Sequence, residues 1–297
     1  MMWAYALEGK ELQAIDVASL SEVHKFGSKA DWLWVDFLIP DENESEILAE
    51  LLGNEKAIVN DIKEGVYNLL YMYTRYEKRY DYTLLSLPFV DIEKELEMHP
   101  VFVIIKKKMI ITWGCSHCPV LMKAIFRTLK EYASEGMKTD IFFVLSRLLR
   151  EVVSLNSKTL VTIRERINKL EEEALHKSGK KMLHSIFELK KQVSTLHRLL
   201  SLEKGLLCDV REGIVPNVRL NEEAKLVVED SINNVSQDLE FMDSYDRGLD
   251  SILSLLNLGS IHRVETSINF LTIILVIATI ILVLLELIAR SAHAALI

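Results

Sequence analysis

Cysteine is scarce in this chain of 297 residues, which has only Cys115, Cys118 and Cys208. Three cysteines do not make a disulfide framework, and we expect a chain that folds without one. Cys115 and Cys118 flank Ser-His in a Cys-x-x-Cys spacing that zinc and redox sites also use. No second ligand pair lies nearby and no thioredoxin-like setting surrounds it, so packing at a strand end is the favoured interpretation.

Motifs of catalysis are missing as well. No glycine-rich phosphate loop follows a predicted strand, no nucleophile is accompanied by a base, and no pair of acids lies on a rigid frame. The chain also opens without a basic leader or signal peptide. We therefore predict that it is not an enzyme and that its N-terminal part stays in the cytoplasm.

Positive charge is sparse in one part of the chain. Residues 220–270 hold ten acidic side chains against three basic ones, which accounts for −7 of the total net charge of −8. Such a balance makes nucleic acid an unfavourable partner and cations a favourable one.

A long hydrophobic run is present at residues 270–289. These twenty residues are apolar except for Thr272, Thr279 and Glu286. A helix of that length spans about 30 Å, the thickness of a bilayer's hydrocarbon core. The alternative of a buried soluble helix fits poorly with so many β-branched residues. We expect a single-pass protein of the cell membrane, with residues 291–297 as a short tail outside.

The polar residues of this run share one face. Asn269, Thr272, Thr279, Glu286 and Arg290 fall within an arc of about 100° on a helix. An ionisable residue in hydrocarbon is costly, so this stripe is expected to face water or other helices. One helix cannot enclose a path, and we interpret the stripe as the lining of a pore within a ring of identical chains. The alternative is a Glu286 that reaches the membrane edge and pairs with Arg290.

Residues 1–138 have the pattern of a cytoplasmic mixed α/β domain. Turn residues separate short β-rich runs from helical segments. A lysine run, 106–108, marks a hairpin tip in the last strand region. The predicted strands are 3–7, 12–17, 32–37, 68–76, 82–90 and 101–113, and the predicted helices are 45–52, 55–63 and 119–134.

The rest of the chain is predicted to be helical, which makes the fold class α+β. Residues 139–216 form a long antiparallel hairpin of two helices, 141–174 and 182–210. Residues 217–268 form a stalk helix, with Asn221 as its N-cap, and it continues into the membrane helix 269–290. No proline and only two glycines interrupt about 70 residues. The stalk carries a three-four apolar seam typical of helices that self-associate: Val228, Ile232, Val235, Leu239, Met242, Asp246, Leu249, Leu253, Leu256 and Ser260.

Three aspartates of the stalk share a face at spacings of three and four: Asp243, Asp246 and Asp250. In a symmetric bundle each would become a ring of carboxylates, able to hold Mg²⁺ or another hard divalent cation as a regulatory ligand. A solvated acidic face is an equally good interpretation of the same pattern.

The order of these parts resembles the CorA family of divalent-cation transporters. The local likeness lies in Trp32-Leu-Trp-Val-Asp36, Val59-Asn-Asp-Ile62, the strands 80–90 and 102–113, Asn269-Phe-Leu-Thr-Ile-Ile274 and Ile277-Ala-Thr-Ile280. The resemblance covers essentially the whole chain. It implies a pentamer around a central pore lined by the first membrane helix, with Mg²⁺ or a related ion as substrate.

Two features depart from the family pattern. Ala289-Arg290-Ser291 stands where the family has its Gly-Met-Asn signature, and one membrane segment is present where the family has two. The expected function is therefore a CorA-like homo-oligomeric cation channel or transporter. The alternative is a non-conducting, membrane-anchored oligomeric sensor or scaffold related to CorA.

Overall fold

The computed structural model describes most of the chain. The described residues are 2–9, 11–17, 19–37, 42–53, 59–60, 62, 74–79, 81–92, 96–114, 119–135, 139–176 and 180–294, with the backbone alone at 119–124, 175–176, 259–260, 262–263 and 284–294. The chain divides into two compact units. The first is Met1–Glu165 with Lys191–Asp246, and the second is Arg166–Lys190 with Arg247–Ile297.

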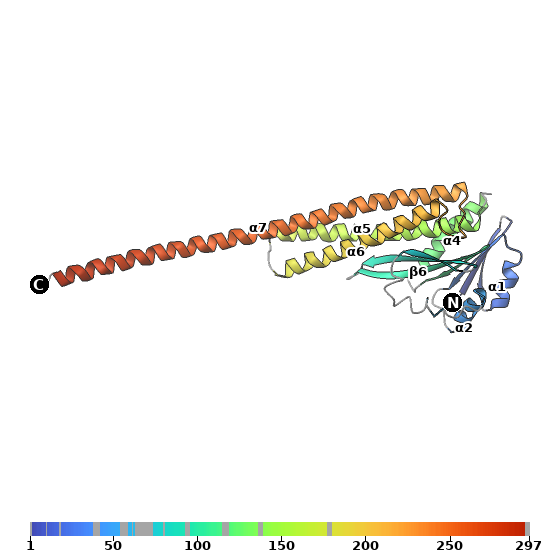
Figure 1. Cartoon of the computed structure of the whole chain (residues 1–297), viewed down its shortest axis with the longest axis horizontal. Coiled ribbons are helices and arrows are strands. Elements are labelled where there is room, and N and C mark those ends of the chain that lie inside the picture. Colours follow the sequence, from blue (N-terminus) through green and yellow to red (C-terminus); the bar gives the residue numbers. More distant parts are fainter. Residues whose placement is uncertain are drawn as a thin grey trace. The chain divides into compact units, whose positions relative to one another are not determined.

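Seven strands form one sheet in the first unit (Figure 1). The spatial order is β2-β1-β3-β7-β6-β5-β4, in which β3 and β7 run parallel and all other neighbours run antiparallel. The mixed sheet predicted for the N-terminal region is thereby confirmed. The strands are β1 (Met2–Glu8), β2 (Glu11–Val17), β3 (Trp32–Phe37), β4 (Arg75–Lys78), β5 (Thr83–Ile92), β6 (Leu96–Lys106) and β7 (Met109–Trp113).

Both faces of the sheet are buried along β3, β5 and β7, where successive side chains alternate between two apolar layers. Leu33, Val35 and Phe37 of β3 join a core that includes residues of α1 (Leu20–Gly27) and α2 (Glu42–Leu51). Trp34 belongs to the opposite face. It packs on Tyr5, whose ring also lies 5.0 Å from that of Phe126 in α4 (Pro119–Ser134).

Helix α1 was not predicted from the sequence. It has only eight residues, with Ser19 as its N-cap accepting a hydrogen bond from the Glu22 N–H. Leu20, Val23 and Phe26 face the core at three-residue spacing, but a pattern of only two turns is too short to be recognised from the sequence.

Two other predictions are tested only in part. The predicted strand 68–76 meets β4 at Arg75 and Tyr76, and residues 68–73 lie outside the described residues. Of the predicted helix 55–63, residues 59, 60 and 62 are helical and the others lie outside the described residues. Cys115 and Cys118 also lie outside them.

The β5–β6 hairpin is longer than predicted, because β6 begins at Leu96 rather than at 101. Proline interrupts a strand pattern when it removes a ladder hydrogen bond. Here Pro88 and Pro100 lie directly opposite one another, and among the described pairings neither has a partner in a strand on its other side. The predicted lysine tip between β6 and β7 is confirmed, with Lys107 in the left-handed region at φ 50°.

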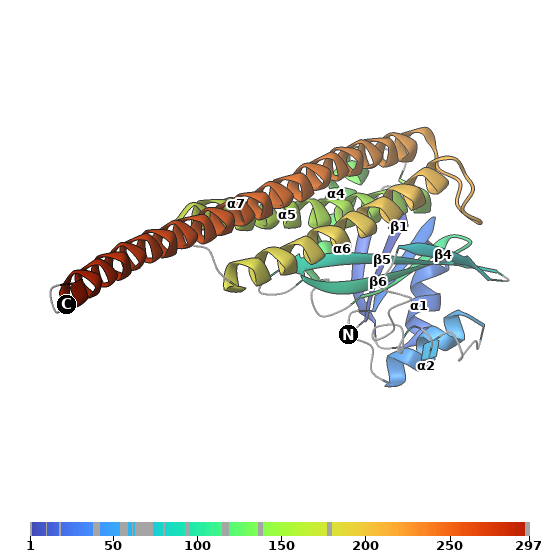
Figure 2. The same cartoon turned by 60° about the vertical axis from the view of Figure 1, so that its left-hand side comes forward.

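Three long helices follow: α5 (Ile141–His176), α6 (Lys180–Arg211) and α7 (Glu222–Ala294). Asn221 is the N-cap of α7, as predicted, because its side-chain oxygen accepts a hydrogen bond of 2.8 Å from the Ala224 N–H. Helix α7 runs for 73 residues without a break, which confirms the predicted continuity from stalk to membrane segment. In the first unit, α5–α7 lie on the side of the sheet away from α1 and α2 (Figures 1 and 2).

Candidate functional site

The C-terminal half of α7 carries the polar stripe. Within the described residues, one helix is long and apolar enough to cross a membrane, at Val264–Val283, and none of that segment is buried. Asn269, Thr272 and Thr279 are all exposed in the single chain. The apolar side chains around them are equally bare, and Leu275 is 69% exposed. The described part of the chain therefore leaves this segment uncovered.

The two threonines of the stripe share one geometry. The Thr272 hydroxyl donates to the Ile268 carbonyl and the Thr279 hydroxyl donates to the Leu275 carbonyl, each at 2.8 Å. A hydroxyl has one proton to donate and two lone pairs that accept. With the proton used inside the helix, each oxygen presents acceptor capacity outward. Water around a cation points its hydrogens away from the ion, so such oxygens suit a hydrated cation.

The positions of two side chains in the predicted stripe, Glu286 and Arg290, are not tested by the structure. Glu286 and Arg290 have a described helical backbone, but their side chains lie outside the described residues. Their place in the stripe stays a prediction from the spacing of the sequence.

The stalk aspartates lie beside basic side chains of α6. In the first unit, Asp243 Oδ1 lies 3.3 Å from His197 Nε2, and in the second, Asp250 Oδ1 lies 2.5 Å from Lys190 Nζ. Asp246 is half-buried and is also engaged in an interaction. No group of three or more His, Cys, Asp or Glu side chains within the described part of one chain is arranged to hold a metal. A cation site at these aspartates would thus need a second chain.

The apolar seam of the stalk is covered by the chain itself. Val228, Val235, Met242 and Leu249 are all 0% exposed. Ion pairs and hydrogen bonds from α7 to α5 and α6 show which helices cover it. This corrects the prediction that the seam serves self-association. The same three-four spacing also suits a helix packed inside a three-helix bundle, and spacing alone does not separate the two.

A buried polar cluster joins the helices to the sheet, and sequence reasoning missed it. Asn156 of α5 donates from Nδ2 to both carboxylate oxygens of Glu203 in α6, at 3.1 and 3.3 Å. Its Oδ1 accepts a hydrogen bond of 2.9 Å from the Val90 N–H of β5. Both residues occupy apolar positions in their helices, between Val152 and Leu160 and between Leu200 and Leu207. That interruption was the available signal.

The cluster has a distinctive electrostatic character. Burial raises the pKa of Glu203 to about 8, the hydrogen bond from Asn156 lowers it, and the nearby Asp238 carboxylate raises it. Burial also raises the pKa of Asp238, whose carboxylate accepts a hydrogen bond from the Ser157 hydroxyl. Near neutral pH, Glu203 is therefore held largely protonated.

A second buried carboxyl lies in the middle of the sheet. Thr112 Oγ1 donates to Asp36 Oδ1 at 2.5 Å and accepts from the Trp34 indole N–H at 2.9 Å. Burial raises the pKa of Asp36 to about 7, against the hydrogen bond from Thr112. On the same strand, the Trp32 indole N–H donates to the Thr139 carbonyl. The Trp32–Asp36 motif thus acts in the core of the first unit and not in a site open to solvent.

The family of the chain follows from comparison with known proteins. The profile of the family described as CorA-like Mg²⁺ transporter protein matches residues 29–282. The chain belongs to this family. The match starts shortly before β3 and ends at residue 282, within the candidate span Val264–Val283, so it includes the candidate stripe at Asn269, Thr272 and Thr279.

Solved structures show that the whole fold is CorA-like. The complete CorA magnesium transporter from Methanocaldococcus jannaschii is 17% identical, with a TM-score of 0.73 over 92% of this chain and 81% of that one. Full-length CmaX is 12% identical, with a TM-score of 0.71 over the same shares. The cytoplasmic domain of ZntB from Vibrio parahaemolyticus is 11% identical, with a TM-score of 0.63 over 88% of this chain and 98% of that one. Comparison with curated proteins finds no match.

Proposed function

We propose that the chain forms a homo-oligomeric divalent-cation channel or transporter of the cell membrane, with Mg²⁺ or a related metal ion as its substrate. The observation that carries this proposal is the stripe of outward acceptor oxygens on an otherwise apolar, uncovered helix. Family membership supports the same class of function. A pentamer is the subunit number that we propose, with the N-terminal domain in the cytoplasm.

The ion path would run along Asn269, Thr272 and Thr279. In a ring of identical chains, each threonine gives a ring of oxygens that accept hydrogen bonds from the water shell of the ion. Keeping that shell suits Mg²⁺, which gives up its water reluctantly. Glu286 would add negative charge further along the same face, and Arg290 would oppose it.

Flux measurements test the proposal. The full chain is reconstituted in liposomes loaded with a magnesium-sensitive dye, and uptake is followed after external Mg²⁺ is added. The double variant Thr272→Val with Thr279→Val keeps the shape and removes both oxygens. A lost hydrogen bond is worth about 1 kcal/mol, or about fivefold, so uptake should fall by about tenfold or more.

A matched control comes from the same helix. Ser267 lies about 140° around the helix from Thr272 and about 160° from Asn269, on the face away from the stripe. Ser267→Ala should leave uptake unchanged. Equal losses in the double variant and the control would mean that the stripe is not the path.

The second candidate function is a non-conducting, membrane-anchored oligomer that senses or scaffolds. The observation that favours it is Ala289-Arg290-Ser291 at the place of the family signature. The same liposomes separate the two functions. A parent chain that inserts and assembles but admits neither Mg²⁺ nor another divalent cation would establish the scaffold and exclude the channel.

A further inference from the structure

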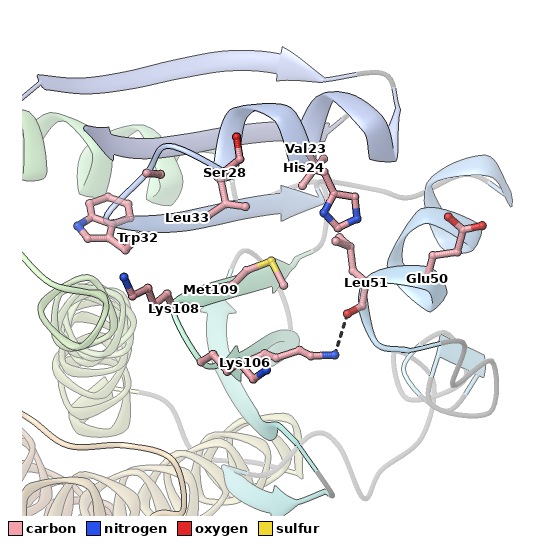
Figure 3. Close-up of a pocket in the computed structure, with 13 residues that line it drawn as sticks. Val23, His24, Ser28, Trp32, Leu33, Glu50, Leu51, Lys106, Lys108 and Met109 are labelled. Atoms are coloured by element: carbon pink, nitrogen blue, oxygen red, sulfur yellow. Dashed lines mark hydrogen bonds between the residues drawn. The ribbon is translucent and has the colours of Figure 1, made fainter. Parts of the chain in front are cut away.

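A pocket lies in the first unit, at one end of the central strands of the sheet. It is bounded by α1, the end of α2, the start of β3 and the turn between β6 and β7 (Figure 3). We call it the hairpin-tip pocket. Its volume is about 650 Å³. Pockets that hold small molecules fall between roughly 300 and 1,000 Å³, with mostly apolar walls and a few polar groups.

Apolar side chains form most of the wall. Val23, Leu33, Leu51 and Met109 contribute aliphatic and thioether surface. The first three of these are buried, so the wall is part of the packed core and holds its shape. A ligand with an apolar body would fit such a wall.

Three consecutive lysines give the pocket a positive charge. Lys106, Lys107 and Lys108 all line it, against one acidic residue, Glu50. Lys106 is already engaged, since its Nζ lies 2.8 Å from Asp81 Oδ2 and donates to the Leu51 carbonyl at 3.0 Å. Lys106 and Lys108 extend in different directions in Figure 3. Lys107 and Lys108 are exposed at the tip and supply the charge.

We propose that the hairpin-tip pocket binds a small organic anion, with an apolar ring or chain in the hollow and a phosphate or carboxylate at Lys107 and Lys108. Ammonium groups bind both anions as point charges with several donors. The left-handed backbone at Lys107 holds the two lysines at a tight two-residue turn. The proposal concerns the cytoplasmic domain and does not depend on whether the membrane helix conducts.

Calorimetric titration of the full chain in lipid nanodiscs tests this binding, with empty nanodiscs subtracted. Adenosine monophosphate probes an organic phosphate, and 1-naphthoate probes an organic carboxylate. Two further titrations are controls: adenosine has the ring system without the anionic group, and inorganic phosphate has the anionic group without the ring system. We expect saturable binding of one molecule per chain for at least one of the two anions, and much weaker binding of adenosine and of phosphate.

Three variants locate the site. Lys107→Asn with Lys108→Gln removes both charges, so affinity should fall about tenfold or more. Asparagine is chosen at 107 because it tolerates the left-handed backbone. Lys25→Gln with Lys29→Gln removes the same charge from nearby exposed residues that do not line the pocket, and should change affinity less than twofold. Ser28→Trp places a ring at the exposed rim and should block binding.

The outcomes decide the proposal. Absence of saturable binding by both anions overturns it. Equal losses in the two lysine pairs would show nonspecific attraction, and unchanged affinity in Ser28→Trp would show that the hollow is not occupied. Whichever of the two anions binds more tightly identifies the chemical source of the ligand.

Discussion

Helix α7 contains two apolar halves that differ in what covers them. In the half from Val228 to Leu256, most seam residues are buried in the single chain, with Val235 and Leu249 at 0% exposure. In the half from Leu258 to Val283, side chains of the same kind are bare, with Leu258 at 63%. One unbroken helix therefore passes from partners inside the chain to partners outside it.

Polar residues of α7 have different partners in the two halves. In the covered half, Asp238 faces Ser157 of α5 and Asp243 faces His197 of α6. In the bare half, the two threonine hydroxyls of the stripe donate to carbonyls of their own helix. The first arrangement fixes helix packing, and the second leaves oxygens for water or ions.

The largest expected effect is the loss of stability caused by a charge in the covered half. Val235→Asp places a charge where no cation or water reaches, and the free energy of unfolding should fall by about 3 kcal/mol or more. Leu258→Asp, the matched change in the bare half, should alter it by less than about 1 kcal/mol. Thermal unfolding of the full chain in detergent measures both. Similar losses at the two positions would contradict the contrast between the halves.

The next effect concerns pH. The pKa of Glu203 is raised from its ordinary value of 4.5 to about 8, so the folded state keeps a proton that the unfolded state has lost in this interval. Stability should therefore fall as the pH rises from about 5 to 8, by a few kcal/mol at most. Asp36 and Asp238 act in the same direction, since burial raises the pKa of each.

Glu203→Gln keeps a hydrogen-bonding partner for Asn156 and removes the titration. The slope of unfolding free energy against pH should become shallower, while Glu240→Gln, at an exposed position of α7, should leave the slope as in the parent. A parent whose stability rises with pH over this interval would contradict the assignment.

A smaller effect concerns cations at the stalk. We propose that Asp243, Asp246 and Asp250 of neighbouring chains share divalent cations, so millimolar Mg²⁺ should raise the oligomer mass measured by light scattering relative to EDTA. Asp246→Asn should reduce that difference, and Asp230→Asn, at an exposed position of the same helix, should not. Equal masses with Mg²⁺ and with EDTA for the parent would rule out this role.

The smallest effect is at the ion pair of the second unit. Lys190 and Asp250 are 26% and 59% exposed, and such pairs contribute about 0 to 1 kcal/mol. Asp250→Asn should therefore change the unfolding free energy by less than about 1 kcal/mol. A loss as large as that of Val235→Asp would mean that this pair is desolvated in the assembled protein.

Much of the fold could be predicted from periodicity. The hydrophobic run at 270–289 and the absence of proline gave the membrane segment and the continuous α7, because both follow from local sequence. The partner of the seam could not be predicted, since an apolar face has the same spacing whichever helix covers it. The contact between Asn156 and Glu203 is equally hidden, because it joins residues 47 positions apart.

The central claim is that one face of the bare half meets water. In a cysteine-free background, single cysteines at Thr272 and Thr279 are compared with single cysteines at Ile274 and Ile281, about 180° around the helix. The reconstituted chain is treated with a water-soluble methanethiosulfonate reagent, and labelling is measured by mass. The account predicts rapid labelling at 272 and 279 and little at 274 and 281. Equal labelling of the two faces, or none on either, would contradict it.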